Sequence, residues 1–278
     1  MTSSPEPEGI VDVALIQMNS GPDIAENLDF AADGAARAAE SGARFILTPE
    51  NTCHIRHPAS AKLQSAPREE DHPALPRFST LARDFGVSIM LGSISINLGD
   101  RIANRSYVFA PDGAIAARYD KIHLFDVSLP GGENYKESDL VKPGDKAVLA
   151  DLPFGRVGMT ICYDLRFSDL FRLLAQQGAS MIAVPAAFTV QTGMSHWETL
   201  LRARAIETGS YILAPAQTGE HEGGRRTWGH SMIVAPWGEI VAQAGCEPDI
   251  LRASLDLSRV AQARAAVPSL KHGRAFTL

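Results

Sequence analysis

Cysteine is scarce in this chain of 278 residues. The three cysteines, Cys53, Cys162 and Cys246, are odd in number and far apart, whereas disulfide frameworks need paired cysteines in short secreted chains. This scarcity excludes a fold held together by disulfides. We therefore expect free thiols, and with them a protein of the reducing cytoplasm.

Long apolar runs are also missing. The longest, from about Met181 to Val190, is much shorter than the roughly 20 apolar residues that a membrane-spanning helix needs. Residues 1–9 have neither a basic start nor an apolar run, so we expect a short disordered lead there and no secretion signal. A membrane protein is therefore not expected.

The chain has no excess of positive charge. It contains 26 Lys and Arg against 32 Asp and Glu, which gives a formal net charge of -6 at neutral pH. Because no dense basic run overrides this balance locally, the surface would repel a phosphate backbone. Nucleic acid is therefore not an expected partner.

Apolar residues are plentiful enough for a sizeable core. Hydrophobic residues make up 45% of the chain and charged residues 21%, which is typical of a globular protein and not of a disordered one. No linker or low-complexity segment divides the sequence. We expect one domain over residues 10–278.

Strand-like and helix-like patterns alternate along the chain. In the first half they predict strands at 10–16, 45–47 and 87–91, helices at 26–40 and 75–85, and a hairpin at 107–110 and 114–118. In the second half they predict hairpins at 147–152 with 156–161 and at 231–235 with 239–243, helices at 168–177 and 197–207, and strands at 181–184 and 211–214. This alternation favours an α/β fold, and the two similar halves favour a four-layer αββα sandwich.

Three short stretches each place a reactive or charged residue at the end of an apolar strand, and these residues are Glu50, Lys121 and Cys162. Because strand ends meet in a crevice in α/β sheets, the three side chains can converge. A thiolate attacks carbonyl carbons, a carboxylate can take the thiol proton, and an ammonium stabilises developing negative charge. The set has the parts of a nucleophilic hydrolase.

Each of the three residues also has an ordinary structural explanation. Cys162 could be a small buried hydrophobe, Glu50 a carboxylate at a helix start, and Lys121 a charge that protects an edge strand. Sequence spacing alone does not demonstrate that they meet.

The same stretches resemble the three signature motifs of the nitrilase, or carbon-nitrogen hydrolase, superfamily, and the resemblance runs from Val11 to about Leu257. It implies Cys162 as nucleophile, Glu50 as general base and Lys121 as stabiliser of the transition state. It also implies the αββα sandwich, no metal or organic cofactor, and assembly as a homodimer or larger homo-oligomer.

Further motifs resemble the branch that contains ω-amidase and deaminated glutathione amidase. They are Lys121-Ile-His-Leu-Phe-Asp126, Pro130-Gly131, Glu137-Ser138, Pro143-Gly144, Cys162-Tyr-Asp-Leu-Arg-Phe167 and the segment from His196-Trp197 to Glu207. The branch implies that Glu137 is a second glutamate that positions substrate and water. Without the resemblance, Glu137 would be interpreted as a surface loop residue.

Four residues are candidates for substrate binding. Arg166 could bind a substrate carboxylate through paired hydrogen bonds, or it could pair with a neighbouring aspartate instead. Tyr163 follows the nucleophile and would offer its backbone N–H, while Phe188 and Thr189 would line the pocket. The charged loop from Glu220 to Arg226 departs from the family pattern, which leaves the preferred acid open.

The expected function is therefore hydrolysis of a small carboxylate-bearing amide to acid and ammonia through a thioester. A nitrilase or N-carbamoyl amide hydrolase of the same superfamily is the nearest alternative. An inactive scaffold or binding protein on this fold would be expected to have lost one of the three motif residues, and all are present.

Cys53, His54 and His57 place three potential metal ligands in five residues. The regular ligand spacing of a zinc site is missing there. Because this segment directly follows Glu50, we expect it to form a loop at the mouth of the pocket.

Overall fold

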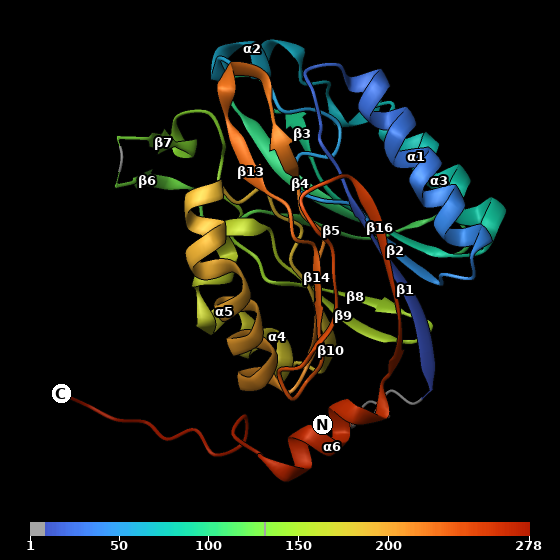
Figure 1. Ribbon diagram of the computed structural model, residues 1–278, viewed down its shortest axis with the longest axis vertical. Helices are drawn as coiled ribbons and strands as arrows, with labels where there is room; N and C mark the ends of the chain where they lie inside the picture. Colours follow the sequence, from blue (N-terminus) through green and yellow to red (C-terminus); the bar gives the residue numbers. More distant parts are fainter. Residues whose placement is uncertain (1–8, 131) are drawn as a thin grey trace.

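The computed structural model describes residues 9–130 and 132–278. Residues 1–8, which make up nearly all of the predicted lead at 1–9, lie outside the described part. Two six-stranded sheets dominate the described chain, and helices cover their outer faces (Figure 1).

The first sheet has the strand order β16-β1-β2-β3-β4-β5. Strands β1, β2 and β3 run parallel, while β4, β5 and β16 pair antiparallel with their neighbours. Helices α1 and α3 pack side by side against this sheet. The bounds are β1 (Ile10–Gln17), α1 (Ile24–Glu40), β2 (Phe45–Leu47), α3 (Ala74–Phe85), β3 (Ser88–Asn97), β4 (Ile102–Phe109), β5 (Ile115–Asp120) and β16 (Asp249–Asp256).

The second sheet has the order β15-β14-β11-β10-β9-β8, with β9, β10 and β11 parallel. Helices α4 and α5 pack against it. The four layers therefore follow the predicted αββα order. The bounds are β8 (Val148–Leu152), β9 (Gly155–Met159), α4 (Ser168–Gln176), β10 (Ala179–Ala183), α5 (Val190–Thr208), β11 (Tyr211–Ala214), β14 (Met232–Val234) and β15 (Ile240–Gln243).

Shorter elements surround one end of the sandwich or extend the chain at its end. They are α2 (Ala59–Ser65), η1 (Glu69–Asp71), β6 (Asp126–Ser128), β7 (Asn134–Lys136), η2 (Glu137–Asp139), η3 (Cys162–Arg166), β12 (Thr218–Glu220), η4 (Glu222–Gly224), β13 (Arg226–Trp228) and α6 (Ser258–Ala266). In Figure 1, α2, β6, β7 and β13 gather near the start of α5.

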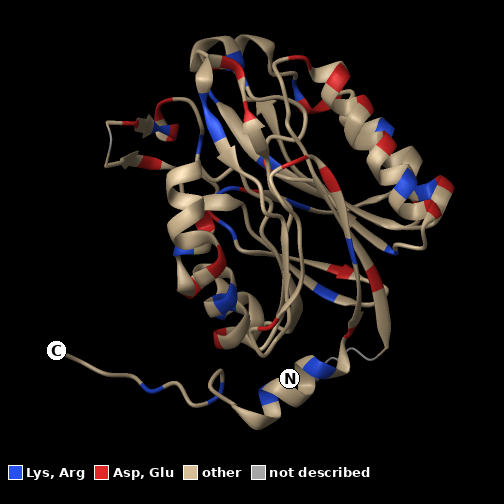
Figure 2. Cartoon of the chain, viewed as in Figure 1, with Lys and Arg blue, Asp and Glu red and all other residues tan. Residues whose placement is uncertain are grey.

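The alternation of side chains along β1 explains how two cores form. Val13 and Leu15 face the core between the two sheets, whereas Ala14 and Ile16 face the core beneath α1 and α3. Successive residues of a strand point to opposite faces, so a strand with apolar residues on both faces must be covered on both. Charged residues are instead frequent on the helices, as on α1 and α5 in Figure 2.

Several boundaries differ from the sequence-based expectation. Helix α5 begins at Val190 and not at Trp197, because the low helix propensities of Val190, Thr192 and Gly193 hid its first turn. Strand β3 continues to Asn97, although the predicted strand ended at residue 91, just before Gly92. Its pairing register with β4 shifts between Leu91 and Ile94. Strand β16 has alternating exposure and was not predicted, although it pairs with the whole of β1.

Gly92, on β3, lies against the segments that follow β2 and β10. A Cβ there would overlap the carbonyl oxygen of Thr48 and come within 2.5 Å of the Pro49 carbonyl oxygen and 2.7 Å of Pro185 Cβ. Pro49 precedes Glu50, and the carbonyl of Pro185 accepts the backbone N–H of Cys162. The absent side chain thus permits both segments to approach.

We expect Gly92→Ala to lower the free energy of unfolding by about 1–3 kcal/mol or more, as overpacked cores do. Urea denaturation of the variant beside Gly21→Ala checks this. Gly21 is the matched control because a Cβ there meets nothing within 4 Å and its φ is not positive. Equal stability of the two variants would contradict the close approach.

Candidate active site

Glu50 lies in the turn that follows β2. The backbone N–H of Thr48 still donates to the Met90 carbonyl at 3.0 Å, which holds the chain against β3. The side-chain amide of Gln217 donates to the Glu50 carbonyl at 3.1 Å. Asn51 then adopts φ +57°, which turns the chain. The Glu50 side chain is held at this turn and is 3% exposed.

Lys121 directly follows β5. Its backbone N–H donates to the Asn104 carbonyl at 3.0 Å, and its carbonyl accepts from the Gly144 N–H at 2.8 Å. Its Nζ donates to Glu50 Oε1 at 2.8 Å and to Glu137 Oε2 at 2.9 Å. The side chain is 2% exposed, and a buried ammonium is tolerated only with such partners. Lys121 therefore links two carboxylates from distant parts of the chain.

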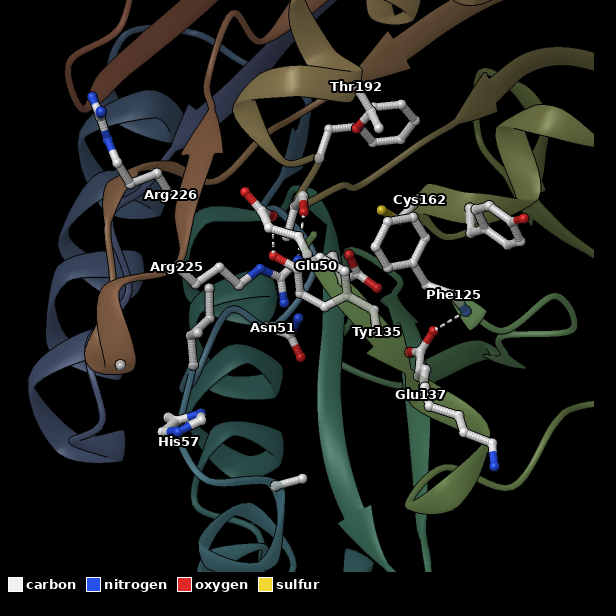
Figure 3. A pocket seen from close by; sticks show the side chains of 18 of the residues that line it. Glu50, Asn51, His57, Phe125, Tyr135, Glu137, Cys162, Thr192, Arg225 and Arg226 are labelled. Atoms are coloured by element: carbon white, nitrogen blue, oxygen red, sulfur yellow. Dashed lines mark hydrogen bonds between the residues drawn. The ribbon is translucent and has the colours of Figure 1, made fainter. Parts of the chain in front are cut away.

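Asn104, on β4, connects the same two carboxylates. Its Nδ2 donates to Glu50 Oε1 at 2.9 Å and to Glu137 Oε1 at 3.3 Å, and the residue is 3% exposed. Glu137 Oε2 also accepts the backbone N–H of Phe125 at 2.7 Å (Figure 3). These donors hold both carboxylates beside Lys121.

Cys162 is the first residue of η3 and lies at the sharp turn that follows β9. Its φ of +50° is unusual for a residue other than glycine, and such strain persists only where surrounding contacts impose it. Its N–H donates to the Pro185 carbonyl at 2.9 Å. The buried carboxylate of Asp164 accepts from the Ile161 N–H at 2.8 Å and the Tyr119 hydroxyl at 2.7 Å. The turn is thereby held from both sides.

The charges at the site determine where the protons reside. Burial alone would raise the pKa of Glu50, but the Lys121 ammonium outweighs it and holds that pKa below its usual range. Burial raises the pKa of the Cys162 thiol well above its ordinary value, and the Glu50 charge adds to this rise. Burial would lower the pKa of Lys121, but Glu137 and Glu50 raise it. At neutral pH the site holds a thiol, carboxylate and ammonium.

A cavity of about 950 Å³ opens over these groups (Figure 3). Although the whole chain carries a net charge of -6, basic side chains outnumber acidic ones in the lining. The charged lining residues are Arg56, Lys62, Lys121, Lys136, Arg166, Arg225 and Arg226 with Glu50, Glu133, Glu137 and Glu222. The cavity is therefore suited to a small anionic molecule.

Comparison with known proteins identifies the family. The model of the carbon-nitrogen hydrolase family matches residues 12–265. The chain belongs to the carbon-nitrogen hydrolase family. The resemblance to this superfamily in the sequence motifs is thereby confirmed.

Named relatives agree with this assignment. This carbon-nitrogen hydrolase is 43% identical over 267 residues to a deaminated glutathione amidase of Yersinia enterocolitica, covering 95% of this chain and 93% of that protein. It is 33% identical over 262 residues to omega-amidase NIT2 of Xenopus tropicalis, covering 94% of each. The crystal structure of the C. elegans NitFhit protein superimposes with a TM-score of 0.90 at 36% identity. That match covers 96% of this chain and 66% of the C. elegans chain.

The structure brings together Glu50, Lys121 and Glu137, and it places Cys162 in the lining of the same cavity. Tyr163, Arg166 and Phe188 also line that cavity. The convergence that sequence spacing left open is therefore present in this carbon-nitrogen hydrolase.

Thr189 is placed differently from the expectation. It is 2% exposed and is not among the described residues that line the cavity. Its hydroxyl instead accepts the Thr192 N–H at 3.4 Å at the start of α5. Thr192 reaches the cavity from the first turn of this helix, which the sequence pattern had not revealed.

In the described part of the chain, Arg166 forms no ion pair with Asp164 or Asp169, the two aspartates near it in sequence. Its guanidinium lies 5.5 Å from the centre of the Phe188 ring and 5.8 Å from that of Tyr163. Its Nη2 lies 3.3 Å from Nδ1 of His196. Arg166 is thus supported mainly by aromatic rings at the cavity wall.

Sequence reasoning missed Asn104, Lys62 and Arg225. Asn104 lay within an apolar strand pattern, and a lone asparagine there carried no visible signal. Lys62 belongs to a short helix that was not predicted, and its Nζ donates to Asn51 Oδ1 at 2.7 Å. Arg225 belongs to the charged loop from Glu220 to Arg226. The departure of this loop from the family pattern was the only sign in the sequence that Arg225 could have a role in the site.

The segment after Glu50 forms the expected loop at the pocket mouth, with Arg56 and His57 in the lining. Cys53 is buried, and burial raises its pKa to about 12. Burial lowers the pKa of His54 to about 3. Among residues 9–130 and 132–278, no group of three or more His, Cys, Asp or Glu is arranged to hold a metal ion. No helix in these ranges is long and apolar enough to cross a membrane.

We expect Asn104→Leu to shift the acid limb of the pH profile of kcat/KM upward. An N–H donor favours the ionised carboxylate, so its loss raises the pKa of Glu50, and hydrolysis then needs a higher pH. The optimum kcat/KM should fall about tenfold, the effect of losing one hydrogen bond to a charged group. The measurement is kcat/KM from acid to alkaline pH.

Asn97→Leu is the matched control, because Asn97 lies on the neighbouring β3 and outside the cavity lining. If kcat/KM of Asn104→Leu fell by the same factor at every pH and the acid limb did not move, Asn104 would have only a structural role.

Proposed function

We propose that the chain is a cysteine amidase that hydrolyses a small carboxylate-bearing amide to an acid and ammonia through a thioester. The observation that carries the proposal is Lys121 held between Glu50 and Glu137, with Cys162 lining the same cavity. Membership of the carbon-nitrogen hydrolase family and the amidase names of two relatives support it.

In the first half of the reaction, Cys162 Sγ attacks the amide carbon while its proton passes to Glu50. The charge that develops on the amide oxygen is stabilised by Lys121 Nζ and the backbone N–H of Tyr163. The carbon–nitrogen bond then breaks, and Glu50 returns the proton to the leaving ammonia. The acyl group remains on sulfur as a thioester.

In the second half, water attacks the thioester carbon and gives a proton to Glu50. Glu137 orients this water, since its carboxylate and that of Glu50 both accept from Lys121. The carbon–sulfur bond breaks, the proton returns to sulfur, and the free acid leaves. Tyr163, Arg166 and Phe188 form the wall that holds the substrate.

We also propose that residues 10–278 act as one domain and assemble as a homodimer or larger homo-oligomer in the cytoplasm. Met194 and Ile206 on α5 are 67% and 57% exposed, and Trp237 is 57% exposed, which supports an interface on this side. The three free cysteines support a reducing compartment.

The test is product release from succinamate, N-carbamoyl-β-alanine and propionitrile by the wild type, Cys162→Ala and Cys246→Ala. We expect ammonia from succinamate, with a loss of about a thousandfold or more in Cys162→Ala because the nucleophile is gone. Cys246 is exposed and outside the cavity lining, so its variant should keep full activity.

Turnover of only the nitrile or the carbamoyl compound would assign the chain to the alternative activities. Turnover of succinamate that survives Cys162→Ala would contradict the nucleophile. Absence of any turnover by the wild type would favour the inactive scaffold.

A further inference from the structure

Five cations that line the cavity form no ion pair within 4 Å among the described residues: Arg56, Lys62, Arg166, Arg225 and Arg226. Of these five, Lys62 and Arg225 interact electrostatically with Glu50. By contrast, Lys121 in the same cavity contacts two carboxylates. Desolvated charges without a counter-ion are costly, so an uncompensated pair of cations indicates a place for an anion.

Lys62 lies beside the general base. Its Nζ donates at 2.7 Å to Oδ1 of Asn51, the neutral amide of the residue that follows Glu50. Burial lowers the pKa of Lys62 to about 8, and the charges of Arg225 and Lys121 act in the same direction. The attraction of Glu50 and Glu137 does not cancel this fall. A bound carboxylate would supply the missing negative charge.

Arg225 lies beside the nucleophile. Its Nη2 donates to the Ala187 carbonyl at 2.7 Å, and the Ala187 N–H lowers the pKa of Cys162. Its guanidinium stands 5.5 Å from the centre of the Tyr135 ring, and its Nε is buried without a hydrogen-bond partner in the described chain. In Figure 3, Arg225 reaches into the pocket toward Asn51 and Tyr135. A buried donor without an acceptor requires an explanation.

The hairpin that carries Arg225 is held in place. Strands β12 and β13 pair from Thr218 to Trp228, and Glu222 Oε2 in their connection accepts the His57 N–H at 2.8 Å. The connection is therefore fastened to the loop that follows Glu50. This fixes the guanidinium over the cavity before substrate arrives.

We propose that Lys62 and Arg225 form the subsite for a free carboxylate on the acyl part of the substrate. This inference rests on the proposed amidase function and names the residues that select its carboxylate-bearing substrate. The carboxylate would accept from Arg225 and Lys62 while the amide carbon faces Cys162. Because Lys62 contacts the neighbour of Glu50 and Arg225 contacts Ala187 beside the thiol, only a short chain separates the two ends.

Arg166 is the competing anchor. It lies over two aromatic rings and contacts His196, whereas Arg225 and Lys62 interact electrostatically with Glu50 and with each other. Two converging cations provide a point charge and a planar fork for one carboxylate. Arg166 alone would provide the planar fork without the second positive charge.

The experiment measures binding and turnover separately in the full-length wild type and in Lys62→Met, Arg225→Met, Arg166→Met and Lys142→Met. Calorimetric titration with succinate reports binding of a carboxylate without chemistry. Steady-state kinetics compare succinamate with succinamide, a neutral substrate of nearly the same shape. Lys142 is exposed and outside the cavity lining, so its variant is the matched lysine control.

We expect Lys62→Met and Arg225→Met each to weaken succinate binding about 10- to 100-fold, the effect of losing a charge-assisted hydrogen bond. The preference for succinamate over succinamide should fall by a similar factor, mainly through KM. Lys142→Met should change neither quantity, and Arg166→Met should change both less than either subsite variant.

Unchanged succinate binding in both subsite variants would overturn the inference, as would failure of the wild type to bind succinate. A larger loss in Arg166→Met would transfer the anchor to that residue and also overturn it. Succinate binding that depends on Lys62 and Arg225 without any ammonia release would instead refute the amidase function and leave the subsite standing.

Discussion

The buried ammonium of Lys121 is the interaction on which the site depends. It holds Glu50 and Glu137 at 2.8 and 2.9 Å, and neither carboxylate is close to the other in sequence. An unpaired charge at 2% exposure would be strongly unfavourable, so the ends of β2 and β5 and the segment after β7 must meet for the fold to be stable. The same contact that satisfies the lysine therefore positions Glu50, the proposed base.

The charges around Lys121 also determine which groups of the site carry protons. A carboxylate with a lowered pKa beside a thiol with a raised pKa is a pair prepared for proton transfer, not one in which transfer has already occurred. The cavity above it has an excess of cations, in a chain that is negative overall. Such a field concentrates small anions at the site, whereas neutral molecules gain no such enrichment.

The sequence predicted those parts of the structure that depend on local patterns. Apolar patterns and turn residues predicted most strands of both sheets. The three motifs placed Glu50, Lys121 and Cys162 at strand ends. Contacts between distant segments could not be predicted in this way. Asn104 looks like any polar residue in a strand, and the roles of Lys62 and Arg225 depend on a short helix and a hairpin that close over the cavity. Thr189 was expected in the pocket because it follows the end of a strand, but it caps the start of α5 instead.

The measurement that tests the account most directly is the thiolate absorbance at 240 nm as a function of pH, taken as the difference between the wild type and Cys162→Ser. Because burial and the Glu50 charge raise the pKa of Cys162, the account predicts no thiolate from this residue at neutral pH. It also predicts that Glu50→Gln shifts the titration to lower pH. A full thiolate signal from the wild type at neutral pH would contradict the account, since the thiol proton would then already have left before substrate binds.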